Sequence, residues 1–93
     1  MNKKDERYDI VKNLLDTGSI KEFRQIFLYI PKKIVYSDLG VNYSRFLELI
    51  KNTKRFRLEE LITLASLFDV DPKTLIDLAY NQYLDDLKGK RKK

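Results

Sequence analysis

Apolar side chains recur every three or four residues along almost the whole chain, and this spacing restricts the fold more than any other feature. Residues three and four apart share one face of an α-helix, whereas a half-buried strand needs strict alternation. No segment alternates in that way, and no internal repeat interrupts the helical pattern. Because 93 residues suffice for one domain and not for two, the sequence predicts a single all-α domain of five or six short helices.

Glycine, proline and capping residues mark the ends of these helices. Gly18 and Gly40 follow apolar stripes, where a left-handed glycine commonly ends a helix. Asn42 is a favoured N-cap, and Ser19 with Glu22 has the spacing of a capping box. The pattern as a whole predicts helices over residues 6–16, 20–30, 32–39, 43–51, 58–68 and 72–86. We expect the folded domain to span 1–87 and residues 88–93 to form a basic disordered tail.

Several side chains needed for common enzyme chemistries are missing from the sequence. There is no cysteine and no histidine, which removes thiolate nucleophiles, the commonest general base and the usual zinc ligands. The three glycines lie more than 20 residues apart, so they form no phosphate-binding loop. The acidic pairs Glu59-Glu60 and Asp85-Asp86 are expected on exposed helix faces, which disfavours acid/base catalysis. We therefore expect no enzyme activity, no cofactor and no metal site.

Membrane association is also disfavoured by the sequence. No stretch approaches the 18 consecutive apolar residues of a membrane-spanning helix, and the chain does not open with the pattern of a signal peptide. We therefore expect a soluble cytoplasmic protein with no membrane partner.

Charge is unevenly distributed along the chain. Residues 32–57 carry seven basic and two acidic side chains, whereas residues 58–86 carry one basic and seven acidic. A polarised chain of this kind presents a basic surface that suits a polyanion. The alternative is a solvated surface on which the charges cluster by chance.

The basic segment contains two short helices with the spacing of a helix-turn-helix unit, around Gly40. The second helix exposes a polar first turn that includes an arginine, the residue type that bonds guanine edges bidentately. An ion pair between Arg45 and Glu48 is the intramolecular alternative to that contact. The candidate base contacts are Asn42, Tyr43, Ser44, Arg45 and Glu48. The candidate phosphate contacts are Lys32, Lys33, Lys51, Lys54 and Arg55.

Residues 32–46 resemble the helix-turn-helix of phage-repressor-type (Cro and lambda-repressor-like) DNA-binding domains. The resemblance extends through 54–61 and 64–75 and covers roughly 20–79. It implies a five-helix domain whose third helix, over 43–51, enters the major groove. Two positions depart from the family pattern. Tyr36 stands where a small residue is usual, so its ring must swing outward or widen the helix crossing. Arg57 stands where a serine or threonine usually caps the fourth helix.

These features lead to one main functional hypothesis and two rivals. The main hypothesis is a sequence-specific double-stranded DNA-binding protein, a small prokaryotic or phage-like transcriptional regulator. The rivals are a protein-interaction module, such as an antitoxin-like partner with the same fold, and a binder of structured RNA.

Two apolar stripes lie at the margins of the domain and bear on oligomeric state. One comprises Tyr8, Val11, Leu14 and Leu15, and the other lies within 75–87. We expect at least one of them to pack against a second copy, giving a homodimer with two recognition helices about 34 Å apart. The alternative is that the first helix folds back and completes a monomeric core.

Overall fold

The computed structural model describes residues 5–91, which are helical apart from short connections. Its helices are α1 (Arg7–Asp16), α2 (Lys32–Leu39), α3 (Tyr43–Lys51), α4 (Leu58–Phe68) and α5 (Pro72–Arg91). Two 3₁₀-helices, η1 (Phe23–Leu28) and η2 (Thr53–Arg55), lie between them. The described residues contain no strand, so the predicted all-α class is confirmed. Within this part of the chain, no helix combines the length and the apolar character needed to cross a membrane.

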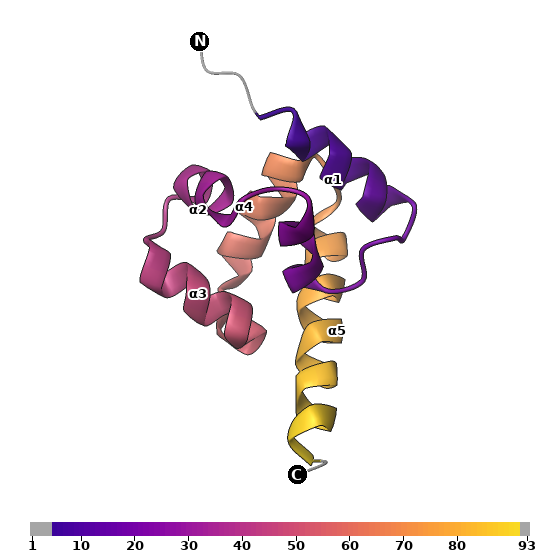
Figure 1. The fold of residues 1–93 in the computed structure, drawn as a ribbon, viewed down its shortest axis with the longest axis vertical. Helices are drawn as coiled ribbons and strands as arrows, with labels where there is room; N and C mark the ends of the chain where they lie inside the picture. The colour runs from indigo at the N-terminus through magenta and orange to yellow at the C-terminus, as the bar shows by residue number, and fades with distance from the viewer. Residues whose placement is uncertain (1–4, 92–93) are drawn as a thin grey trace.

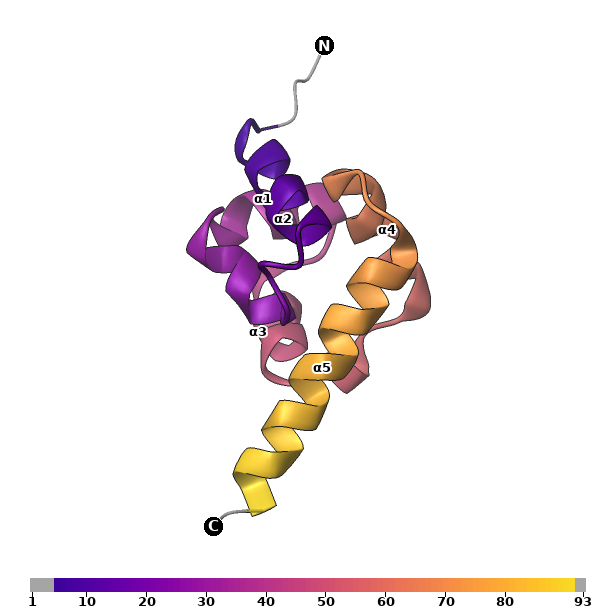
Figure 2. The ribbon, with the colours of Figure 1, turned by 90° about the vertical axis from the view of Figure 1, so that its right-hand side faces the viewer.

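The helix α4 contacts α1, α2 and α5. As Figure 1 shows, α2 and α3 lie together on one side of it, and α5 runs down the other side. The last turns of α5 project beyond the other elements in both Figure 1 and Figure 2, which gives the molecule its long dimension of 49 Å. The α2–α3 pair and the C-terminal end of α5 therefore lie on different parts of the molecular surface.

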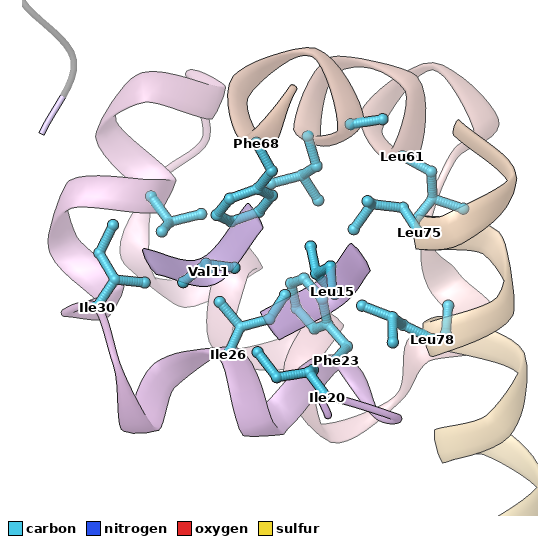
Figure 3. Packing of buried hydrophobic residues seen from close by; sticks show 14 of the residues in the cluster. Val11, Leu15, Ile20, Phe23, Ile26, Ile30, Leu61, Phe68, Leu75 and Leu78 are labelled. Carbon is cyan, nitrogen blue, oxygen red and sulfur yellow. The ribbon is translucent and has the colours of Figure 1, made fainter. Parts of the chain in front are cut away.

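The core draws on every α-helix and joins α1 to the rest of the domain. Tyr8, Val11 and Leu15 of α1 are buried, and Figure 3 shows Val11 and Leu15 among side chains of η1, α4 and α5. The first helix thus folds back over the domain, which is the alternative considered above. Because the apolar stripe of α1 is packed against the core, a homodimer would have to form through the stripe on α5.

The ring of Phe23 links η1 to the helix α3. It is fully buried and meets Phe27, Phe46 and Phe56 edge-to-face, with ring centroids 4.9–6.1 Å apart. Such edge-to-face pairs add about 0.5–1.5 kcal/mol each beyond the burial of their area. Because Phe46 belongs to α3, this cluster fixes the inner face of that helix and leaves its outer face to solvent.

The helix predicted over 20–30 is replaced by the shorter η1. Buried residues occur here at Ile20, Phe23 and Ile26, a strict spacing of three that matches the three residues per turn of a 3₁₀-helix. The predicted capping box is also wrong. The Ser19 hydroxyl pairs with that of Thr17, 2.9 Å away. The amide of Glu22 instead donates to Oε1 of Gln25, at 3.1 Å.

The C-terminal boundary differs from the prediction as well. The helix α5 continues to Arg91 instead of ending near residue 86, so 88–91 are helical and not a disordered tail. Lysine and leucine are good helix formers, and cations near a helix C-terminus interact favourably with its dipole. Residues 92–93 of the expected tail lie outside the described residues.

Candidate nucleic-acid interface

The turn between α2 and α3 has the geometry expected from the sequence. Gly40 ends α2 in the left-handed region, with φ +86°, and its amide donates to the carbonyl of Tyr36 at 3.0 Å. Asn42 caps α3, since its side-chain oxygen accepts from the Arg45 amide at 2.8 Å. The Asn42 side chain therefore already has a structural partner, which reduces its capacity to contact a base.

The Arg45 side chain lies across the interface between α3 and α4. Its Nε and Nη2 donate to the two carboxylate oxygens of Glu60, at 2.9 and 2.8 Å. The amide of Arg57 donates to the same carboxylate at 2.8 Å. Burial raises the pKa of Glu60, but the hydrogen bonds from Arg45 and the Arg57 amide outweigh it and leave that pKa below its usual value.

This arrangement changes the expected roles of both residues. Glu60 is only 7% exposed, so the prediction of an exposed Glu59-Glu60 pair is wrong for its second member. Arg45 holds α3 against α4, and its guanidinium is turned back toward the protein. The intramolecular partner considered for it, Glu48, instead lies 3.4 Å from Arg55. Glu60 also accepts from the amide of Arg57, the N-cap residue of α4, which is the part that the third helical residue plays in a capping box.

The outer face of α3 carries the other candidate base contacts. Ser44, Glu48 and Lys51 are exposed and recur at four- and three-residue spacing, so they lie along one side of the helix. Tyr43 stands at the start of this face with 52% of its surface exposed. Phe46 and Leu49 are fully buried on the opposite side. The helix is thus amphipathic, with a polar stripe that faces away from the core.

Exposed cations stand at both ends of the α2–α3 pair. Lys32 and Lys33 are the first two residues of α2. Lys51 is the last residue of α3, and Lys54 and Arg55 belong to η2. All five side chains are exposed. Lys51, Lys54 and Arg55 place positive charge at the C-terminal end of α3, whereas the ammonium of Lys32 lies over the ring of Phe27, 5.9 Å from its centroid.

The Tyr36 ring packs against two rings of α3. It is half-buried, with its centroid 5.7 Å from that of Phe46 and 5.6 Å from that of Tyr43. The crossing therefore gains an aromatic contact at the position where the family pattern has a small residue. The sequence indicated a steric problem at Tyr36 but did not indicate which ring it would meet.

A solvent-open cavity of about 260 Å³ lies between the α2–α3 turn and α4. Arg57, Glu59 and Glu60 contribute its charged lining. The carboxylate of Glu60 already accepts hydrogen bonds from Arg45 and Arg57, so it is poorly placed to exchange protons with a ligand. Among residues 5–91 there is no cluster of three or more side chains suited to holding a metal ion.

Comparison with known proteins identifies no relative of this chain. No protein-family model, curated protein or solved structure matches the chain significantly. The resemblance to phage-repressor-type domains therefore remains an expectation from the sequence. The function proposed below rests on the positions of the side chains.

Two further residues position the α2–α3 pair and were missed in the sequence. Gln82 of α5 is fully buried; its Oε1 accepts from the Arg24 amide at 2.7 Å and its Nε2 donates to the Ile50 carbonyl at 2.5 Å. The hydroxyl of Tyr8 donates to Asp38 on α2 at 2.8 Å. Burial, followed by this hydrogen bond, raises the pKa of Tyr8 above its usual range, so the hydroxyl remains a donor. The sequence did contain a sign of the role of Gln82: it is a polar residue one turn after Leu78, on the face of α5 that packs against the core.

Proposed function

We propose that this chain binds double-stranded DNA sequence-specifically through the outer face of α3, as a small prokaryotic or phage-like transcriptional regulator. One observation carries the proposal: an amphipathic helix presents an exposed polar stripe, with exposed cations following it in η2 and others at the start of α2. The sequence resemblance to phage-repressor-type domains supports the same function. In this proposal α2 and α3 act as a helix-turn-helix, with α3 as the recognition helix.

The dimensions of α3 suit the major groove. An α-helix with its side chains is about 10–12 Å across, and the major groove of B-DNA is about 12 Å wide. Because the inner face of α3 is fixed by Phe46, Leu49 and the Arg45–Glu60 pair, the helix can be inserted as a rigid element. Rigid presentation reduces the side-chain ordering that binding would otherwise require.

The contacts divide into base and phosphate contacts by their position. Tyr43, Ser44 and Glu48 lie on the outer face and are the proposed base contacts, with Glu48 able to accept from a cytosine amino group. Arg45 and Asn42 support the helix from within, through Glu60 and the N-cap. The cations at the two ends contact phosphates and set the register of the helix on the duplex.

The proposal includes a homodimer that uses the outer stripe of α5. Ile76, Tyr80 and Leu84 lie one helical turn apart and are 38%, 58% and 38% exposed. A two-fold pair of chains would present two copies of α3 to successive turns of one face of DNA, about 34 Å apart. Doubling the recognition helix lengthens a site that one helix would read over only a few base pairs.

A protein-interaction module is the second candidate, favoured by the apolar surface of α4. Leu58 and Ile62 are 62% and 47% exposed and lie one turn apart. Exposed apolar pairs of this kind can seat a partner protein. In that case the cations around α3 would serve solubility, and DNA would be bound weakly at any salt concentration.

Binding to a random-sequence duplex over a salt series separates the two candidates. The proposal predicts that affinity falls steeply with salt, because each neutralised phosphate releases counterions. The double variant Lys32→Ala with Lys33→Ala should lower the slope of log affinity against log salt by about 2, at about 0.9 for each contact. Lys73→Ala is the matched control, since Lys73 is an exposed cation at the start of α5. Equal slopes for both variants would place the lysines of α2 away from DNA.

A further inference from the structure

An aromatic ladder leads from the core to the exposed start of α3. Phe46 is fully buried, Tyr36 is half-buried with its centroid 5.7 Å away, and Tyr43 follows at 5.6 Å with 52% of its surface exposed. The interplanar angles are 51° at both steps. The exposed ring of Tyr43 is therefore supported from behind by a second ring that is itself seated on the core.

Two exposed lysines stand on the same helix as the middle ring of this ladder. Lys32 and Lys33 lie four and three residues before Tyr36, on the same side of α2, and both are exposed. Ser44 follows Tyr43 and is exposed as well. An exposed ring on a surface that also carries cations suits a polyanion with small apolar groups on its surface.

We infer that Tyr43, held in place by Tyr36, recognises the C5-methyl group of a thymine in the major groove. The inference rests on the proposed function and specifies what α3 reads. Within a duplex the faces of the bases are covered by their neighbours, so a protein ring reaches only their edges. The thymine methyl is the apolar group on those edges, and contact with apolar side chains is how it is distinguished. Tyr43 stands in the first turn of α3, where recognition helices contact base edges.

Deoxyuridine provides the probe, since it lacks this methyl group and keeps the hydrogen-bonding edge of thymine. Duplexes are first selected from a random pool with the wild-type chain. Each thymine of a selected site is then replaced singly by deoxyuridine, and affinities are measured by fluorescence anisotropy. Wild type should bind about fourfold more weakly after replacement at the contacted position, the factor expected from burying one methyl-sized group.

The variants test whether Tyr43 is responsible for this difference. Tyr43→Ala should bind thymine and deoxyuridine duplexes equally, whereas Tyr43→Phe should keep the wild-type ratio because the ring remains. Tyr36→Leu keeps an apolar contact with Phe46 and should give a ratio between the two. Tyr29→Ala is the matched control, since Tyr29 is another exposed tyrosine that lies outside α3, and it should keep the full ratio. Circular dichroism of each variant checks that α3 is still folded.

The outcomes distinguish this inference from the function on which it rests. If wild type binds its selected duplex but is insensitive to every deoxyuridine replacement, or if Tyr43→Ala keeps the sensitivity, the inference is overturned and DNA binding stands. If single-stranded DNA competes better than the duplex and Tyr43→Ala removes that binding, the ring stacks on an unpaired base instead. If no duplex is selected at any salt concentration, both the inference and the proposed function are overturned.

Discussion

Arg45 and Glu60 are joined by two parallel hydrogen bonds of 2.8 and 2.9 Å that tie α3 to α4. Bidentate pairs of this kind are the stronger and more directional ion pairs in proteins. Removing one partner is costly because the other remains partly buried without its counter-charge. The side chain of Glu60 is 9% exposed and that of Arg45 is 29% exposed, so solvent weakens the effect relative to a fully buried pair.

Arg45→Ala should therefore lower the free energy of unfolding by about 1–3 kcal/mol, below the range of fully buried pairs. Its effect on DNA should follow from the misplaced α3 and weaken binding to all sequences alike. Urea unfolding measures the first effect, and selection from a random duplex pool with the variant measures the second. Lys51→Ala, an exposed cation on the same helix, should leave stability within about 0.5 kcal/mol of wild type. Loss of preference at one base pair only would return Arg45 to the role of a base contact.

The same carboxylate makes stability depend on pH. The folded-state pKa of Glu60 lies below its ordinary value of 4.5, so the unfolded chain takes up a proton first as the pH falls. The contribution of Glu60 is therefore fully present above pH 4.5 and is lost progressively as the pH falls through the folded-state pKa. The free energies of unfolding of wild type and Glu60→Gln are measured by urea unfolding at a series of pH values. The difference between them should shrink below pH 4.5. Glu59→Gln is the control, since Glu59 is exposed; an equal pH dependence in both variants would contradict the assignment.

Gly40 provides a test of the turn that is independent of DNA. Its φ of +86° disfavours any side chain, while no atom beyond Gly40 and its two chain neighbours lies within 4 Å of where a Cβ would stand. Gly40→Ala should therefore cost about 1–2 kcal/mol through the backbone alone, and Gly40→Asn should cost less. A loss of 1 kcal/mol shifts the melting temperature of a domain this size by about 4–8 °C. Gly89→Ala, the same substitution within α5, should be neutral or slightly stabilising; similar losses at both glycines would mean that backbone conformation is not the cause.

The sequence predicted the elements that local chemistry determines and missed those determined by tertiary contacts. The bounds of α2 and α3 follow from Gly40 and Asn42, whose backbone and capping preferences act within a few residues. The partner of Arg45 could not be found in the same way, because Glu60 lies 15 residues away and looked like an exposed acid on a helix. For the same reason the site was predicted as a set of positions, and the division between supporting and exposed side chains required the structure.

Gln82 is expected to act through the two backbone groups that it satisfies. Gln82→Met nearly keeps the volume of the side chain but leaves the Arg24 amide and the Ile50 carbonyl without this partner. A buried backbone group left unsatisfied costs about 1–3 kcal/mol, so two would cost about 2–6 kcal/mol. Because both of these hydrogen bonds are only partly buried, we expect a loss in the lower half of that range. Asn81→Ala removes an exposed hydrogen bond to the Lys21 carbonyl and should cost about 0.5 kcal/mol or less. Urea unfolding compares them, and a near-neutral Gln82→Met would show that water replaces the amide.

The proposed homodimer makes the outer stripe of α5 the place where a charge is least tolerated. Leu84 is 38% exposed on α5, one turn after Tyr80 of the same stripe. A glutamate there would be harmless in a monomer but would be buried without a partner in a two-fold contact between helices. Leu84→Glu should therefore convert a dimer at micromolar concentration into a monomer, measured by sedimentation equilibrium, with unchanged helicity by circular dichroism.

Leu28→Glu is the matched control for this dimer test. Leu28 belongs to η1 and is 77% exposed, so the same substitution falls outside the α5 stripe. It should leave the sedimentation profile of the dimer unchanged. The dimer also predicts two-fold symmetry in the DNA sites that wild type selects, because two copies of α3 would read inverted half-sites. A wild-type chain that sediments as a monomer and selects sites without two-fold symmetry would rule out the dimer and leave the α5 stripe to another partner.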